Sequence, residues 1–257
     1  MIPFEAFFAD FGRGLQFIGQ LMQTLLRRGV ERKLLFDQIW SVSLQSSSTT
    51  AVAGLFVGAI MTVQFTLQVK EFGALGFLGG LATSATIREV GPLLIAFMLS
   101  GKVGAFTSAE LGTMRVTEQL DAIKCLGSDP MEEIVLPRFL AIVISSFFLL
   151  LLGLTASILG GMLMGLMFSG INTEEYIRNI PKIVAGYSIF VGAFKCLCFA
   201  LLLASVCTYK GYNTTGGARG VGRAVLSTSV VTMVGMVIVD WITSFLADTA
   251  LSIYLEI

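Results

Sequence analysis

One apolar run, FLAIVISSFFLLLLGLTASILGGMLMGLMF, fills residues 139–168 and contains no charged side chain. Crossing the hydrocarbon core of a bilayer takes roughly 20 helical residues. The run is therefore long enough to span a membrane, with room to tilt or to bend near Gly160 and Gly161. A backbone in lipid must satisfy its own hydrogen bonds, so the run is expected to be a helix.

The rest of the chain has the same character. Of its 257 residues, 55% are hydrophobic and only 13% are charged, whereas soluble domains carry about 25% charged residues. A transmembrane barrel would show many segments of about ten residues that alternate apolar and polar, and none is seen. We therefore predict an all-α membrane protein. Its five spans are expected at Ala51–Val69, Val90–Phe106 (extended back to Leu81, which includes Arg88 and Glu89), Phe139–Phe168, Tyr187–Cys207 and Val230–Leu251.

The first forty residues are amphipathic. Between Ile2 and Trp40, charged residues lie opposite an apolar face, which predicts a helix lying in the membrane interface. The alternative is a soluble helix packed on the rest of the chain. Residues 1–40 thus form an interfacial region, and residues 41–257 form the five-span domain. The apolar face consists of Phe4, Phe7, Phe8, Phe11, Leu15, Ile18, Leu21, Met22 and Leu25.

Positive charge predicts the orientation, because cytoplasmic loops are enriched in Lys and Arg. Five such residues precede the first span, and six more lie in the loops after the second and fourth spans. The opposite side carries only Lys70, Arg178 and Lys182. We therefore expect a multi-pass protein of the cytoplasmic (inner) membrane, with a cytoplasmic N-terminus and a periplasmic C-terminus.

The longest cytoplasmic loop lies between the second and third spans. Apolar residues at helical spacing predict an amphipathic helix from Ser108 to Leu126, outside the membrane. Gly127 to Pro130 then supply a helix stop and a turn. Such a helix between two spans suits a mechanical coupler, although an ordinary interfacial connection has the same pattern. The coupling residues are Glu110, Arg115, Glu118, Gln119, Asp121, Gly127, Asp129 and Pro130.

The sequence of this loop resembles known permeases. D-A-I-x-x-x-G followed by I-x-L-P is similar to the motif by which ABC importer permeases dock on their ATPases, with six residues before I-x-L-P instead of nine. More specifically, the run IREVGPLLIAFMLSGKVGAFTSAELGTMRVTEQLDAIKCLGSDP, residues 87–130, resembles the MlaE/YrbE family, the permeases of Mla-type and Mce-associated ABC lipid transporters. Lys102 stands where that family often has Arg.

The resemblance implies a permease homodimer that binds cytoplasmic ABC ATPase subunits and, on the outer side, a Mce-domain protein. Its substrate would be phospholipid or a related lipid. The chain has no G-x-x-x-x-G-K-[ST] phosphate loop, so ATP and Mg would be used by the partner ATPase. This chain is expected to need no cofactor and no nucleic acid.

Four charged residues fall within apolar segments, where each costs roughly 2.5 to 3.5 kcal/mol on insertion scales. Measured from the outer ends of their spans, Arg88, Lys195 and Asp240 lie at one depth, roughly 10 to 15 Å in. Two are positive and two negative, so a single cluster would be neutral. It could lie beside the lipid route, or it could only lock the helices together. The four residues are Arg88, Glu89, Lys195 and Asp240.

One face of the first span suits an amphiphilic ligand. Met and Phe adapt to acyl chains, and Gln offers donors to a headgroup. Plain helix packing is the alternative. The candidates for a lipid cavity are Met61, Gln64, Gln68 and Phe72, which share that face, and the neighbouring Val69.

Other functional classes fit less well. The chain has no His, which removes the usual general base and the commonest metal ligand, and no nucleophile and base are visible, so neither an enzyme nor a metal site is expected. An ion-coupled secondary transporter could use the buried charges, but five spans cannot form two equal inverted repeats. A non-transporting membrane scaffold would not need four charges at one depth.

Overall fold

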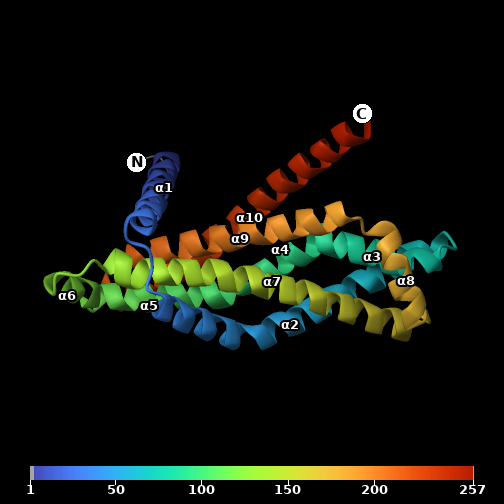
Figure 1. Ribbon diagram of the computed structural model, residues 1–257, viewed down its shortest axis with the longest axis horizontal. Coiled ribbons are helices and arrows are strands. Elements are labelled where there is room, and N and C mark those ends of the chain that lie inside the picture. The colour runs from blue at the N-terminus through green and yellow to red at the C-terminus, as the bar shows by residue number, and fades with distance from the viewer. Residues whose placement is uncertain (1–2, 257) are drawn as a thin grey trace. The chain divides into compact units, whose positions relative to one another are not determined.

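The computed structural model describes the backbone of residues 3–256, and the side chains of residues 3–8, 11, 28 and 254–256 lie outside the described set. The described backbone is helical without strands, and five of its segments are long and apolar enough to cross a membrane. The expected all-α fold with five spans is therefore confirmed. The helices (Figure 1) are α1 Pro3–Arg28, α2 Arg32–Glu71, α3 Leu78–Ala85, α4 Gly91–Leu99, α5 Ala105–Val116, α6 Gln119–Cys125, α7 Leu136–Met164, α8 Thr173–Ile183, α9 Gly186–Tyr212 and α10 Gly217–Glu256, with the short turns η1 Leu75–Phe77, η2 Thr86–Val90, η3 Ser100–Gly104, η4 Met131–Val135 and η5 Gly165–Ser169.

The spanning helices are longer than the apolar runs that predicted them. The first span belongs to α2, which begins at Arg32, and the second is a continuous helical run from Leu75 to Val116. A hydropathy pattern identifies only the apolar part of a spanning helix, so it does not predict the polar residues that extend the helix at its ends. The second run includes two π-helical turns, η2 and η3, which hydropathy does not indicate either.

The amphipathic N-terminal region is not one helix. α1 ends at Arg28, Gly29 adopts a φ of 74°, and Arg32–Trp40 belongs to α2. A glycine with positive φ just after a helix is the usual C-terminal cap, because no Cβ opposes that conformation. Four residues of the predicted apolar face have side chains outside the described set, namely Phe4, Phe7, Phe8 and Phe11.

The predicted coupling helix Ser108–Leu126 is also wrong as a single element. Its first half continues the second span as α5 to Val116, and its second half is the separate helix α6. Between them Glu118 takes a left-handed φ of 61°. Leu111 and Leu120 are both fully buried. In one continuous helix these two leucines, nine residues apart, would point to opposite sides. Helical periodicity alone does not show the turn between them.

The chain divides into two compact units. Unit 1 comprises Met1–Ser43, Ser100–Ser145 and Ala200–Val234. Unit 2 comprises Leu44–Leu99, Ser146–Phe199 and Gly235–Ile257. Each unit therefore draws on segments that are far apart in the sequence.

Unit 1 holds α1 against the end of α9. The Asp10 carboxylate accepts hydrogen bonds from Tyr209 Oη at 2.8 Å and from Lys210 Nζ, and Phe17 packs edge-on against the Tyr209 ring. Partial burial raises the pKa of Asp10, but these hydrogen bonds and the Lys210 charge outweigh it and leave the pKa below its ordinary value of 3.8. Leu15 and Met22 remain exposed on α1.

The helices α2 and α7 approach each other closely in unit 2. A Cβ added at Gly58 would lie 1.7 Å from the carbonyl oxygen of Ser157, and one added at Gly54 would lie 2.0 Å from that of Gly153. Small residues let two membrane helices approach in this way, so that backbone contacts hold them. Small buried residues recur at every fourth position of α2, at Ser46, Thr50, Gly54, Gly58, Thr62 and Thr66.

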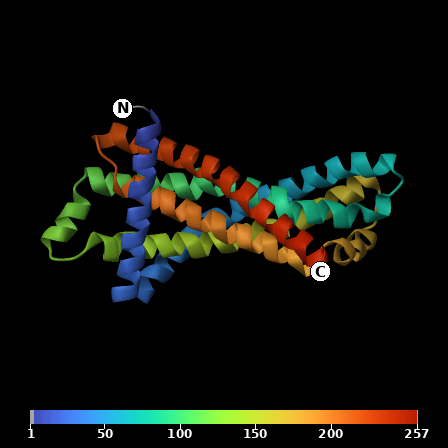
Figure 2. The ribbon, with the colours of Figure 1, turned by 90° about the horizontal axis from the view of Figure 1, so that it is seen from above.

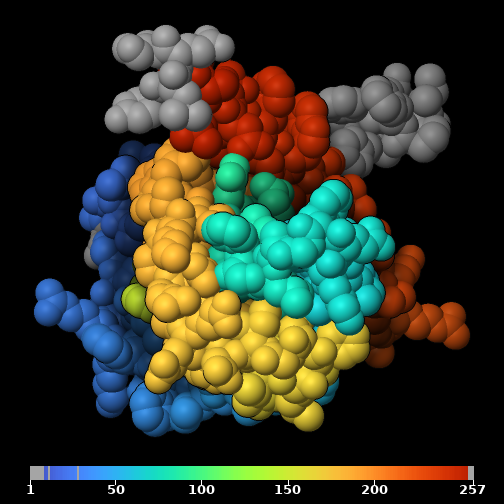
Figure 3. Space-filling view, turned by 90° about the vertical axis from the view of Figure 1, so that its right-hand side faces the viewer, coloured from blue at the N-terminus to red at the C-terminus, as the bar shows by residue number. Residues whose placement is uncertain are grey.

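The helix α8 packs along α3, and the two lie side by side in Figures 1 and 2. Gly79 and Gly80 of α3 allow the approach, because a Cβ at Gly79 would lie 2.3 Å from the carbonyl oxygen of Tyr176. Figure 3 shows the two surfaces in contact, α3 in cyan and α8 in yellow. Tyr176 also bonds Thr62 through their hydroxyls at 3.2 Å, which connects α8 to α2.

The part of α10 in unit 2 is the least covered. Ile238, Trp241 and Phe245 are 53%, 68% and 59% exposed. In a membrane protein such side chains face lipid or another subunit. The adjoining face of α10, with Asp240, Ser244 and Asp248, makes its specific contacts.

Candidate functional site

A π-helical turn carries two of the predicted intramembrane charges. In η2 the backbone N–H of Gly91 donates to the carbonyl of Thr86, five residues back. Pro92 follows and has no N–H, so it cannot donate to the carbonyl of Arg88 as an α-helix requires. Wide turns of this kind occur frequently at functional sites. Here the turn carries Arg88 and Glu89 on the side that meets α10.

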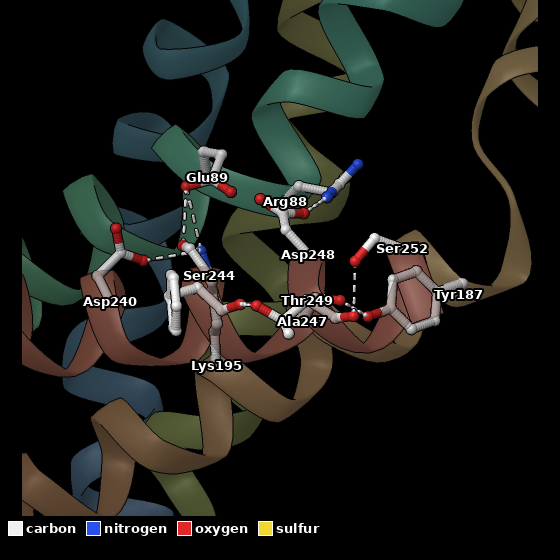
Figure 4. A network of polar contacts seen from close by, with 11 residues as sticks. Arg88, Glu89, Tyr187, Lys195, Asp240, Ser244, Ala247, Asp248, Thr249 and Ser252 are labelled. Atoms are coloured by element: carbon white, nitrogen blue, oxygen red, sulfur yellow. Dashed lines mark hydrogen bonds and ion pairs between the residues drawn. The ribbon is translucent and has the colours of Figure 1, made fainter. Parts of the chain in front are cut away.

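Lys195 is the centre of a polar cluster (Figure 4). Its side chain is fully buried, and its Nζ lies 3.2 Å from Glu89 Oε2 and 3.0 Å from Asp240 Oδ1. The Nζ also donates to Ser244 Oγ at 2.6 Å, and Ser244 donates to Glu89 Oε2 at 3.1 Å. These four residues, which we call the Lys195 cluster, join η2, α9 and α10.

Arg88 is not part of the Lys195 cluster. Its Nη2 lies 2.5 Å from Asp248 Oδ1, although the sequence placed all four intramembrane charges in one group. Asp248 is eight residues beyond Asp240, roughly 12 Å along the helix. Adjacent residues of a helix point in different directions, so Arg88 and Glu89 reach different turns of α10.

Sequence reasoning missed Ser244 and Asp248. Together with Asp240 they lie at i, i+4 and i+8 of α10, which is one face of the helix. That spacing was a usable signal. Nearby, the Tyr187 hydroxyl donates to the carbonyl oxygen of Ala247 at 2.5 Å, so a further contact ties α9 to α10.

The Lys195 cluster is closed at one edge and open at the other. The side chains of Lys195 and Asp240 are 0% and 15% exposed, whereas that of Glu89 is 43% exposed. Glu89 is thus the member that a ligand or water can reach. Among the described residues, no group of three or more His, Cys, Asp or Glu side chains is placed to hold a metal ion.

The predicted lipid face of α2 is mostly open. Gln64, Gln68 and Phe72 are exposed and Met61 is half-buried. Val69 is only 7% exposed, because it continues the buried stripe that packs α2 on its neighbours. Val69 therefore does not share the open face.

The α5–α6 turn is held by charged contacts of the predicted coupling residues. Arg115 Nη1 lies 2.8 Å from Asp121 Oδ1 across the turn, and Gln119 Nε2 donates to Thr117 Oγ1 at 3.0 Å. Glu118, at the apex, is exposed. The turn therefore presents a fixed, charged surface.

The remaining coupling residues connect this turn to α7. Gly127 has a φ of 85°, and Asp129 Oδ1 accepts a hydrogen bond from the backbone N–H of Met131 at 3.0 Å. Pro130 is buried. Glu110 Oε1 accepts a hydrogen bond from Arg138 Nη2 at 2.8 Å, and the Arg138 side chain is only 9% exposed. This pair ties α5 to the start of α7.

A cavity of about 550 Å³ borders the loop. Four of its lining residues are acidic, which makes it a polar cavity and not an acyl-chain site. It is lined by Gly29, Val30, Glu31, Leu34, Gly127, Ser128, Asp129, Glu132, Glu133 and Pro137.

Comparison with known proteins identifies the family. The model of the family described as Permease MlaE matches residues 35–246. The chain belongs to the MlaE permease family. It is accordingly an ABC-transporter permease subunit, and the match begins within α2, so α1 of this MlaE-family permease lies outside the matched region.

Three relatives illustrate the range of this family. A probable ABC transporter permease protein of Synechocystis is 31% identical, over 91% of this chain and 90% of that protein. The intermembrane phospholipid transport system permease protein MlaE of Haemophilus influenzae is 30% identical, over 86% and 87%. The chloroplastic protein TRIGALACTOSYLDIACYLGLYCEROL 1 of Arabidopsis thaliana is 29% identical, over 88% of this chain and 65% of that protein.

Proposed function

We propose that this MlaE-family permease moves phospholipid, or a related lipid, between the inner membrane and a Mce-domain partner. A separate cytoplasmic ATPase, which uses ATP and Mg, supplies the energy. The observation that carries the proposal is family membership over four-fifths of the chain, which includes a relative named for intermembrane phospholipid transport. The active unit is a homodimer in which two copies enclose the lipid route.

Three candidate sites have separate roles in this proposal. The exposed face of α2 formed by Met61, Gln64, Gln68 and Phe72 receives the acyl chains and headgroup. The Lys195 cluster lies beside this route and meets the headgroup at Glu89, its exposed edge. The α5–α6 turn receives the ATPase, because it offers an ordered charged surface. The Arg138–Glu110 pair then passes movement of α5 to α7.

The orientation follows from the distribution of positive charge. Unit 1 contains 12 of the 17 Lys and Arg residues, as expected for segments near the cytoplasm. A cysteine introduced by Glu118→Cys should therefore react only from the cytoplasmic side of sealed vesicles, and one introduced by Glu174→Cys only from the periplasmic side. The measurement is labelling with a membrane-impermeant thiol reagent in a background without the four native cysteines. Cytoplasmic labelling at position 174 would reverse the orientation.

ATPase docking at the α5–α6 turn predicts a charge-sensitive interface. Glu118→Lys reverses an exposed charge at the apex without removing the Arg115–Asp121 pair, so the turn itself should remain folded. We expect at least a tenfold loss of affinity for the ATPase, which corresponds to about 1.4 kcal/mol, and a parallel loss of transport-coupled ATP hydrolysis. Copurification of the ATPase and its activity in the complex are the measurements.

The matched control is Glu174→Lys, which makes the same exposed charge change on α8. It should leave ATPase binding unchanged, because α8 is expected on the opposite side of the membrane. If Glu118→Lys retains full assembly and transport, the docking assignment is wrong.

A further inference from the structure

The charged side chains within the spanning helices of unit 2 do not balance. From Leu44 to Val69, α2 contributes no charge, and neither does α7 from Ser146 to Met164. The described charges on the remaining three spans comprise two cations and three carboxylates. They are Arg88, Glu89, Lys195, Asp240 and Asp248.

The ion pairs assign the excess to one place. Arg88 is matched by Asp248 at 2.5 Å, and this pair is neutral. Lys195 is left facing both Glu89 and Asp240, at 3.2 and 3.0 Å. The Lys195 cluster therefore carries one negative charge too many when both carboxyls are ionised.

The neighbouring titratable groups do not remove this excess. The Tyr187 hydroxyl donates its hydrogen bond to the carbonyl oxygen of Ala247 and not to a carboxyl of the cluster. Cys196 and Cys198 on α9 are free thiols, and an anion there would only add negative charge. The other described charges of unit 2, at the end of α2 and on α8, are not bonded to the Lys195 cluster.

The contact between Asp240 and Lys195 is an ion pair without a well-directed hydrogen bond. Asp240 Oδ1 is buried and close to Lys195 Nζ, yet it accepts no hydrogen bond of acceptable geometry. Lys195 directs its hydrogen bonds to Glu89 and Ser244 instead. A buried anion without a well-directed donor is unfavourable, and protonation of either carboxyl removes the excess charge.

We propose that the Lys195 cluster binds one exchangeable proton, shared between the carboxyls of Glu89 and Asp240. In the loaded state one carboxyl is a neutral acid, the other is a carboxylate, and Lys195 stays an ammonium. On release the O–H bond breaks, the electron pair stays on the carboxyl oxygen, and the proton passes to water. Glu89 is the exchange port because it is the exposed member.

Infrared spectroscopy of the full chain in a maltoside detergent, which has no carbonyl group of its own, tests this directly, because a protonated carboxylic acid has a C=O stretching band that a carboxylate lacks. We expect one such band at neutral pH that shifts in D₂O and disappears at alkaline pH. Either Asp240→Asn or Glu89→Gln should remove it completely, since each leaves Lys195 facing a single carboxylate. The control Asp248→Asn should retain it.

A second measurement covers variants with altered stability. A proton bound only by the folded state stabilises it, so the unfolding temperature of the parent should fall as pH rises through proton release. Asp240→Asn should show no such fall. Absence of the band in the parent, its persistence in both single variants, or its loss in Asp248→Asn would each overturn the proposal. Neither readout measures lipid transport or ATPase activity, so the outcome is independent of the proposed transport function.

Discussion

Lys195→Met should be the most damaging single substitution in the polar cluster. Methionine replaces the unbranched stem of lysine up to Cε and fills most of the buried space, so the effect comes mainly from the lost charge and its hydrogen bonds. Glu89 and Asp240 would then face each other without a cation, and Ser244 would lose its donor. Breaking a buried ion pair by removing one partner costs about 3 to 5 kcal/mol. Thermal unfolding and reconstituted lipid transport are the measurements.

A neutral triple variant separates stability from transport. Lys195→Met combined with Glu89→Gln and Asp240→Asn removes every charge of the cluster, so its destabilisation should be far smaller than that of Lys195→Met alone. Such non-additivity is expected for residues in direct contact. A stable triple variant without transport would support gating or headgroup contact, whereas full transport would leave only a helix-locking role. A Lys195→Met protein as stable as the parent would refute the assigned contacts.

Gly58→Val should force α2 away from α7. The new Cβ would lie 1.7 Å from the carbonyl oxygen of Ser157. The backbone of α2 fixes the position of this Cβ, and the oxygen belongs to the backbone of α7, so neither atom can rotate away. Overpacking costs typically about 1 to 3 kcal/mol and occasionally more, and we expect the upper end here. The measurement is the unfolding temperature in nanodiscs.

The same substitution in an open position provides the control. A Cβ added at Gly222 of α10 meets no atom within 4 Å, so Gly222→Val should change the unfolding temperature much less. Equal effects at the two positions would mean that the valine side chain, and not the α2–α7 contact, causes the loss.

The features that sequence predicted well are those recorded in local pattern. Apolar runs revealed five spans, and charges inside those runs identified Glu89, Lys195 and Asp240, which are in contact. Features set by tertiary contacts were not readable in this way. The break at Glu118 lies between two buried leucines, Leu111 and Leu120, and Val69 belongs to the buried stripe of α2 together with Thr62 and Thr66.

The pairing of Arg88 illustrates the same limit. The two positive and two negative charges of Arg88, Glu89, Lys195 and Asp240 suggest one neutral group of four. Asp248, which also lies in the fifth predicted span, is left out of that group. The π-helical turn before Pro92 and the rise of α10 decide which acid each basic residue meets. Those distances exist only in three dimensions, although the i, i+4, i+8 spacing of Asp240, Ser244 and Asp248 was visible.

Weak apolar coverage of α10 has a mechanical consequence. Within unit 2, Ile238, Trp241 and Phe245 contribute little to holding the helix, because most of their surface is exposed. Its attachment rests instead on contacts at Asp240, Ser244 and Asp248. Displacing α10 would therefore expose little packed apolar surface beyond the fully buried Met236, and much of its energetic barrier would be electrostatic. The strength with which α10 is attached to the rest of unit 2 is then set by the charge of a few side chains.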